Sequence, residues 1–319
     1  MIDGFEHLFG STSGDEPEEL LNGAHLAQIA AVADGELTVS AERTYAASLL
    51  WWKGYDLYAY AALLHGEAAV EGRRQARQRL SGAVLLDPGQ ADGYAALIAI
   101  NNLDGNDELR LPLLQALALT APRFGEEQAS ARRKLPLWYA PLFTPTPVSS
   151  PDDVRLVYAT ALAVASEMPS AGMAWAEHCS PTNPRACAVQ AFLATMLEEW
   201  SDAIDLLTPI EDDPELGRDA SFLCGVAWEA FGFDEPASSH FRRALTRRSG
   251  DAVYLDVRYA LANLHERLGE DDKAVALLSE IYAQQPGYRD VATRLGFNNS
   301  IGEIALPDDA EWREFLDSL

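Results

Sequence analysis

The sequence predicts an all-α fold of the tetratricopeptide-repeat (TPR) type, a helical-repeat superhelix (solenoid) with an extended or β-finger insert near residues 134–150. Two observations support this prediction. First, a small residue recurs at intervals of 32, 34 and 37 positions, at Ala171, Ala203, Ala237 and Ala274. A period near 34 is typical of stacked helix–turn–helix units. Second, closely spaced prolines interrupt the helical pattern between residues 134 and 150, and proline breaks a helix interior.

The third repeat shows the TPR pattern most clearly. Its matching residues are Gly225, Trp228, Gly232, Ala237, Phe241 and Ala244. We expect Gly225 and Ala237 where the paired helices approach most closely, because a larger side chain would force them apart. Trp228 and Phe241 would fill the space between successive pairs. Gly232 permits a positive φ where the first helix ends.

The N-terminal half is predicted to be helical but less regular. Residues 1–15 are expected to form a flexible tail, and residues 16–133 an N-terminal helical part with degenerate repeats. Apolar periodicity predicts helices at 17–33, 40–52, 55–65, 72–86, 90–103 and 107–121. The last two are separated by turn-forming residues at 104–107.

The C-terminal half begins with the insert. Residues 134–150 are interpreted as an excursion from the solenoid, and residues 151–295 as four TPR-like repeats. Ser150 is the expected N-cap of the first repeat, followed by Pro151. Two Asx-Pro pairs, beginning at Asn183 and Asp213, predict the same device at later helix starts. Residues 296–319 form an acidic C-terminal segment, which either caps the solenoid or docks on a partner; capping is favoured.

Charge and composition limit the class of partner. The formal net charge is −25, from 49 acidic and 24 basic residues. Nucleic acid is not an expected partner, because its binding requires a basic surface, and an anionic membrane is disfavoured for the same reason. We expect a protein or peptide with a basic or amphipathic segment. No membrane span or signal peptide is predicted, and three cysteines without paired spacing suggest a reducing cytoplasm.

Motifs of familiar catalytic chemistry are not found in the sequence. The three lysines precede Gly54, Leu135 and Ala274, so no Gly-Lys-Ser/Thr phosphate-binding loop is present. We predict no catalytic residue, no cofactor and no metal. His178, Cys179 and Cys187 come nearest to a zinc site, but structural zinc sites usually contain two close ligand pairs. A packed linker is therefore the preferred interpretation.

The repeat register predicts a binding groove, because the first helix of each TPR pair lines the concave face. Seven residues of the third and fourth repeats are placed there: Asp219, Phe222, Glu229, Asp256, Tyr259, Asn263 and Glu266. The groove would be acidic with an aromatic floor, which suits an extended or helical peptide that carries basic and apolar residues. The alternative is that some of these side chains face only a neighbouring helix or solvent.

The order of segments resembles a known domain. The resemblance rests on Leu85-Leu86-Asp87-Pro88, the helix pair at 90–121, Arg123-Phe124-Gly125, the insert ending Thr146-Pro147-Val148-Ser149-Ser150-Pro151, Trp200-Ser201-Asp202-Ala203 and Ala274-Val275-Ala276-Leu277-Leu278. Over roughly residues 75–295 the chain resembles the N-terminal domain of the EccA family, the AAA+ ATPases of type VII (ESX) secretion in actinobacteria. The resemblance implies a TPR-like superhelix with a β-finger at residues 134–150, and a domain that engages secreted substrates and influences the ATPase hexamer. The family's ATPase module does not follow, so we expect an excised domain or a stand-alone relative.

The predicted function is a protein–protein interaction module, most directly one that recognises substrates or partners of type VII secretion. Small helical-hairpin substrates or an AAA+ ATPase module are the partners that the resemblance implies. The first alternative is a general TPR scaffold or regulatory adaptor unrelated to secretion. The second is an enzyme with a carboxylate pair in the groove, which requires two acids with strongly raised pKa values in a deep pocket.

Overall fold

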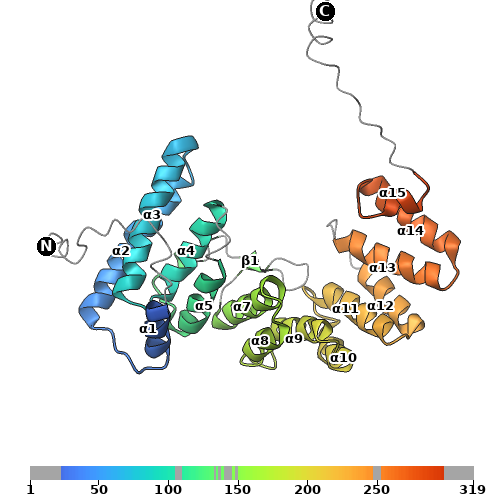
Figure 1. The fold of residues 1–319 in the computed structure, drawn as a ribbon, viewed down its shortest axis with the longest axis horizontal. Coiled ribbons are helices and arrows are strands. Elements are labelled where there is room, and N and C mark those ends of the chain that lie inside the picture. The colour runs from blue at the N-terminus through green and yellow to red at the C-terminus, as the bar shows by residue number, and fades with distance from the viewer. Residues whose placement is uncertain are drawn as a thin grey trace, which may run out of the picture. The chain divides into compact units, whose positions relative to one another are not determined.

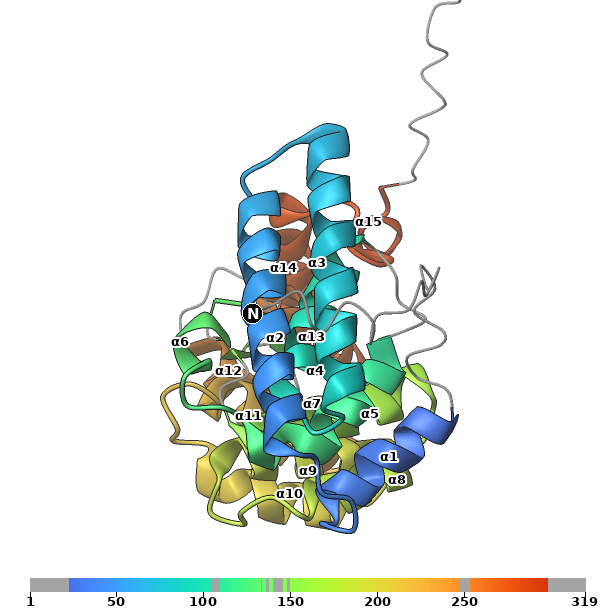
Figure 2. The same cartoon turned by 90° about the vertical axis from the view of Figure 1, so that its left-hand side faces the viewer.

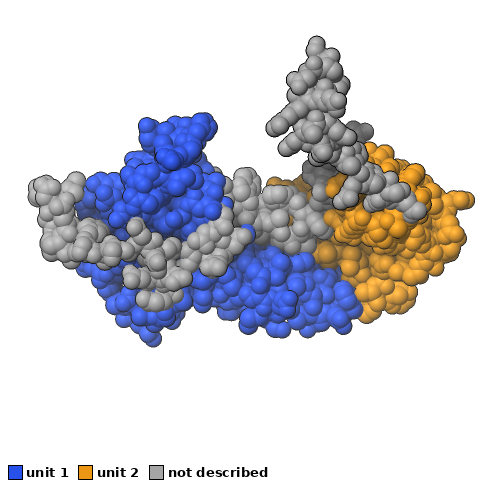
Figure 3. All heavy atoms as spheres, turned by 45° about the horizontal axis from the view of Figure 1, so that its top comes forward, with its two compact units in different colours: residues 1–206 blue, residues 207–319 orange. Residues whose placement is uncertain are grey.

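The computed structural model describes residues 23–104, 110–132, 134–135, 138–139, 146–147, 150–246 and 253–297. The chain divides into two compact units, Met1–Leu206 and Leu207–Leu319 (Figure 3). Helices dominate the described part of both units (Figure 1), which confirms the predicted all-α class. The predicted tail at residues 1–15 and the C-terminal segment after residue 297 lie outside the described residues.

Unit 1 begins with a short helix and a long helical hairpin. These elements are α1 (Gly23–Ala33), α2 (Ala41–Ala61) and α3 (Gly66–Leu86). The helices α2 and α3 run side by side (Figure 2). The helices predicted at 40–52 and 55–65 are therefore a single helix, and the predicted break is wrong. Gly54 lies buried inside α2 and allows close approach to α3, because a Cβ atom there would lie 2.7 Å from Leu80 Cγ.

The next helical pair contains a buried carboxylate. The elements are α4 (Ala91–Asp104), α5 (Arg110–Thr120), η3 (Ala121–Arg123) and α6 (Ala129–Arg132). The buried Asp92 carboxylate accepts hydrogen bonds from the Gly125 amide at 2.9 Å and from the Arg132 guanidinium. Its backbone carbonyl accepts one from Trp51 Nε1 at 2.8 Å. Burial raises the pKa of Asp92, against the opposing effect of the Gly125 amide and the Arg132 charge. The network joins α2, α4 and residues 125–132.

The insert contains one antiparallel pair of two-residue strands, β1 (Trp138–Tyr139) and β2 (Thr146–Pro147). Trp138 pairs with Pro147, and Tyr139 pairs with Thr146. The pairing agrees with the extended or β-finger insert predicted at 134–150. Residues 136–137, 140–145 and 148–149 of that insert lie outside the described residues.

The first two predicted repeats follow the insert. Their helices are α7 (Pro151–Ala165), α8 (Pro169–Ala176), α9 (Pro184–Met196) and α10 (Trp200–Leu207). The predicted cap of α7 is confirmed as a reciprocal pair: the Ser150 hydroxyl accepts from the Asp153 amide at 3.1 Å, and the Asp153 carboxylate accepts from the Ser150 amide at 2.9 Å. Asn183 caps α9 as predicted. Gly172 brings α8 against α7, because a Cβ atom there would lie 2.5 Å from the Ala159 carbonyl oxygen.

Unit 2 contains the third and fourth repeats. Its elements are η4 (Thr208–Ile210), α11 (Gly217–Ala230), α12 (Asp234–Thr246), α13 (Val253–Arg267), α14 (Asp271–Gln284) and α15 (Val291–Arg294). The steric prediction for Gly225 is confirmed: a Cβ atom there would lie 2.5 Å from the ring of Phe241, which is fully buried. Gly232 has φ +80° just after the end of α11, as predicted.

One predicted cap in unit 2 is wrong. Asp213, with the proline after it, was expected to start the first helix of the third repeat. Its carboxylate instead accepts hydrogen bonds from the amides of Glu215 and Leu216, both at 2.8 Å. These amides are held in a turn by the side chain, and α11 begins only at Gly217.

Acid–arginine pairs connect residues that are one repeat apart in the sequence. The pairs are Asp153 with Arg185 in unit 1, and Glu211 with Arg243, Asp234 with Arg267 and Asp256 with Arg289 in unit 2. The members of each pair are 32 or 33 positions apart. The two members of each pair therefore lie about one repeat length apart in the chain.

Candidate functional site

Four of the seven predicted groove residues follow one another along α13. Asp256, Tyr259, Asn263 and Glu266 are spaced three or four residues apart, so they lie on one face of the helix. Each contacts the segment 288–294, which follows α14 and includes α15. We call these contacts the α13 ladder. The structure therefore brings the four residues together, and the chain's own C-terminal side contacts them.

The ladder begins at Asp256 with two donors from the segment 288–294. The Tyr288 hydroxyl donates a hydrogen bond to the Asp256 carboxylate, and the Arg289 guanidinium lies 2.5 Å from the same carboxylate oxygen. Burial, followed by the hydrogen bond and charge of Asp256, raises the pKa of Tyr288. The tyrosine therefore remains a neutral donor over the physiological range.

Tyr259 is the aromatic centre of the ladder. Its hydroxyl donates to the Asp290 carboxylate at 2.7 Å. The guanidinium carbons of Arg289 and Arg294 lie 4.7 and 5.1 Å from the centroid of its ring, which is within the range of cation–π attraction. Burial and the interaction with Asp290 raise the pKa of Tyr259. The Tyr259 side chain thus contacts two arginines with its ring and makes one hydrogen bond through its hydroxyl.

The ladder ends at Arg294. Its guanidinium donates to Asn263 Oδ1 at 2.8 Å and pairs with the Glu266 carboxylate at 2.6 Å. The Arg294 side chain is 17% exposed and that of Glu266 is 43% exposed. In this ion pair the arginine side chain is therefore less exposed to solvent than the glutamate side chain.

Two predicted residues on α11 are placed inside the repeat. Asp219 is fully buried, and its carboxylate accepts from Arg218 Nε at 2.9 Å. It does not line an accessible surface, contrary to the prediction, because it lies in the buried first turn of α11. Phe222 is half-buried, and the centroid of its ring lies 5.8 Å from the ring centroid of Phe241.

Glu229, the third predicted residue on α11, belongs to a clamp between three helices. Arg267 of α13 lies 2.7 Å from the Glu229 carboxylate and 2.8 Å from that of Asp234 at the start of α12. The Glu229 side chain is 23% exposed. Arg267 follows Glu266 in the sequence of α13, so one helix contributes both to the clamp and to the α13 ladder.

An aromatic cluster lies beside this clamp and was not predicted as a surface feature. Trp228 makes ring contacts with Phe231 and Phe233, at centroid distances of 6.3 and 5.7 Å. Both phenylalanines are exposed, by 45% and 54%. The sequence predicts Trp228 in the space between repeats; its side chain is partly buried and packs against these two exposed rings. Two phenylalanines that flank the turn glycine Gly232 were the signal for an exposed cluster instead.

The sequence-predicted metal candidates do not converge. His178 Nδ1 and the thiols of Cys179 and Cys187 each contact a backbone carbonyl oxygen. These contacts agree with the packed-linker interpretation. Among the residues that the structure describes, one other group places three ligand types together: Glu211, Cys224 and His240.

Comparison with known proteins identifies the family. Residues 55–296 match the model described as the N-terminal domain of the type VII, ESX-1 secretion system protein EccA1. The crystal structure of the N-terminal domain of the EccA1 ATPase from the ESX-1 system of Mycobacterium tuberculosis is similar, with a TM-score of 0.60, 19% identity, and coverage of 77% of this chain and 89% of that chain.

A second solved structure has a similar fold. The type IV pilus biogenesis factor PilW gives a TM-score of 0.51 at 14% identity, over 76% of this chain and 98% of its own. At such identities both structures support the fold alone. No curated protein sequence matches the chain. Among the described helices, none is both long and apolar enough to cross a membrane.

Proposed function

The chain belongs to the family of EccA1 N-terminal domains, and on that premise we propose that it recognises the substrates or partners of a type VII (ESX) secretion system. Family membership and the TPR-like fold support the broader conclusion, a helical protein-interaction domain of the secretion machinery. The proposed ligands are secreted helical-hairpin substrates or an AAA+ ATPase module. Each would engage through a basic or amphipathic segment.

The α13 ladder is the observation that supports this proposal most directly. Its carboxylates and the Tyr259 ring already hold two arginines of the same chain. A partner segment with arginine or lysine would meet the same groups, through charge-assisted hydrogen bonds and cation–π contacts. The net charge of −25 favours the approach of such a segment. We propose that the partner exchanges with residues 288–294 on this face.

The aromatic cluster would extend the proposed surface. Arg267 links α13 to the cluster's sequence neighbours, because it pairs with Glu229, which follows Trp228, and with Asp234, which follows Phe233. Exposed aromatic side chains are effective anchors for a partner's apolar residues, while acidic side chains around them set orientation. An amphipathic segment with basic and apolar faces would satisfy both parts.

Charge reversal tests the proposed surface. The double variant Glu229→Lys with Glu266→Lys should bind a secreted hairpin substrate at least about tenfold more weakly, because it places like charges opposite the basic segment. The matched control is Glu36→Lys with Glu127→Lys, two exposed acids of unit 1 that give the same change in net charge. Both altered glutamates of unit 2 have arginine partners, so thermal unfolding must confirm that the variant folds. Equal affinities of the two double variants would contradict the surface.

Identification of the partner tests the function itself. We would use the full chain as bait in cytosol from the source cell and identify the retained proteins by mass spectrometry. Recovery of helical-hairpin substrates or an ATPase subunit supports the type VII proposal. Reproducible recovery of unrelated proteins, with neither of these, favours the general TPR scaffold.

A further inference from the structure

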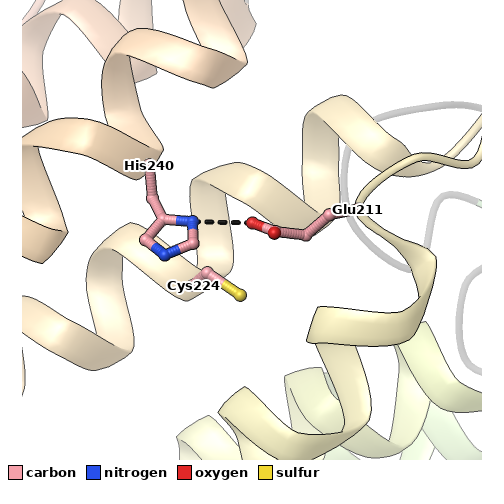
Figure 4. Close-up of side chains that lie close together, drawn as sticks. All are labelled: Glu211, Cys224 and His240. Atoms are coloured by element: carbon pink, nitrogen blue, oxygen red, sulfur yellow. Dashed lines mark hydrogen bonds and ion pairs between the residues drawn. The ribbon is translucent and has the colours of Figure 1, made fainter.

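A polar cluster of unit 2 shares no residue with the α13 ladder and has no part in the proposed function. Glu211 follows η4, Cys224 lies in α11 and His240 lies in α12, so three elements contribute one side chain each (Figure 4). One ligand atom from each residue lies within 4.8 Å of the others. Glu211 and Cys224 are buried, whereas His240 is partly exposed.

We propose that Glu211, Cys224 and His240 form a zinc-binding site. A thiolate, an imidazole and a carboxylate are the three side-chain ligands that zinc uses in proteins. With bonds of about 2.0–2.3 Å, a tetrahedral zinc ion holds its ligand atoms about 3.3–3.7 Å apart. The three side chains therefore need to adjust by only about 1 Å to surround an ion.

The charges around the cluster suit a divalent cation. One thiolate and one carboxylate neutralise Zn²⁺, and the nearby Arg243 charge has a second carboxylate partner, Asp212, at 2.6 Å. His240 Nδ1 lies 2.6 Å from Glu211 Oε1, and Arg243 Nη1 lies 2.9 Å from the other carboxylate oxygen, Oε2. Arg243 thus orients the carboxylate through Oε2, while Oε1 holds His240 and would bind the ion in place of that hydrogen bond. Ligating carboxylates in metal sites are commonly held by such outer partners.

The arrangement also leaves room for a fourth ligand. The His240 side chain is 23% exposed, so solvent reaches the cluster from that side and water can complete the coordination. An ion there would join the connection after η4 to both helices of the third repeat. Its expected effect is to stabilise that repeat.

Without an ion, the same residues form a closed polar network. Glu211 accepts from His240 and Arg243, and the buried Cys224 thiol has a raised pKa because of burial and the neighbouring Glu211. Zinc must displace the thiol proton to bind. Direct metal binding therefore distinguishes a zinc site from a network that serves packing alone.

The test uses the full chain, stripped with a chelator, with Co²⁺ and Zn²⁺ as probes. Cobalt at the site should show the visible bands of a tetrahedral ion and a thiolate charge-transfer band, and should be displaced by zinc. We expect about one equivalent of metal per chain, measured by elemental analysis. Cys224→Ala should abolish the charge-transfer band. His240→Gln should weaken binding by more than the 10–100-fold that is typical of losing an outer partner.

Cys187→Ala is the matched control, because it removes a cysteine outside the cluster and leaves the three ligands intact. It should bind cobalt as the unaltered chain does. Two results would overturn the proposal: no stoichiometric cobalt or zinc binding by the unaltered chain, or an unchanged charge-transfer band in Cys224→Ala. The first of these does not depend on whether any variant folds, and neither depends on the secretion partner.

Discussion

Replacing Arg294 with alanine should loosen the segment 288–294 from α13. Arg294 makes three contacts in the α13 ladder: a hydrogen bond to Asn263, an ion pair with Glu266 and a cation–π contact with Tyr259. Alanine removes all three at once. Asn263 is not fully buried, so water replaces part of what is lost.

The size of the effect follows from these contacts. The hydrogen bond to Asn263 should contribute about 1 kcal/mol. Because Glu266 is 43% exposed, its ion pair is screened and should add no more than about 0.5 kcal/mol. The cation–π contact should add about 0.5 kcal/mol. The total of about 1–2 kcal/mol corresponds to a roughly 5–30-fold rise in the open population of the segment.

Hydrogen exchange read by mass spectrometry can measure this rise locally. Peptides that cover residues 285–297 should exchange roughly 5–30-fold faster in Arg294→Ala, while peptides from α11 and α12 serve as an internal reference. Arg289→Ala is the comparison variant, and it should have a smaller effect because the Arg289 side chain is 53% exposed. Unchanged exchange in Arg294→Ala, or a larger effect of Arg289→Ala, would refute this account of the ladder.

Two further predictions concern packing and pH. Gly225→Ala should destabilise unit 2, because the new Cβ atom would lie 2.5 Å from the buried ring of Phe241 and overpacking costs about 1–3 kcal/mol. This cost should exceed the gain of about 1 kcal/mol from the higher helix propensity of alanine. Slower hydrogen exchange of the α11 and α12 amides than in the unaltered chain would contradict this. Burial lowers the pKa of His25 from its usual 6.5, so the unfolded state takes up the proton first and stability falls as pH drops below 6.5. His25→Gln should reduce this loss of thermal stability between about pH 7.5 and 5.5, and equal pH slopes would count against the assignment.

The steric pattern of the repeats was predictable from the sequence because it is imposed locally. Ala203, Ala237 and Ala274 are all fully buried, since a helix pair can approach closely only where a small residue stands. Ala171, the first of the predicted series, is only partly buried, and its neighbour Gly172 makes the close approach. The Ser150 cap was predictable for a similar reason, because its partner is three residues away. Gly54 shows the limit of this reasoning. Glycine ends many helices, but Gly54 lies within α2, where its lack of a side chain allows α3 to approach closely.

The contacts of the predicted groove were not predictable in the same way. Tyr259 contacts Asp290, and Asn263 contacts Arg294, in each case across 31 residues. Periodicity alone does not predict which side chains contact each other at this separation. The proposed zinc site could not be predicted from the sequence for the same reason. Glu211, Cys224 and His240 belong to different elements and lie 13 and 16 positions apart, so no motif spacing connects them before the helices are packed.

The acid–arginine pairs that span one repeat have a consequence for how each unit unfolds. In a linear array, stability divides into the intrinsic stability of each repeat and the coupling between neighbours. The pair of Asp234 with Arg267 belongs to the coupling, because Asp234 comes from the third repeat and Arg267 from the fourth. The exposed Arg267 side chain makes that coupling sensitive to salt. Ionic strength should therefore act chiefly on the cooperativity within unit 2, so that high salt lets its repeats open more independently of one another.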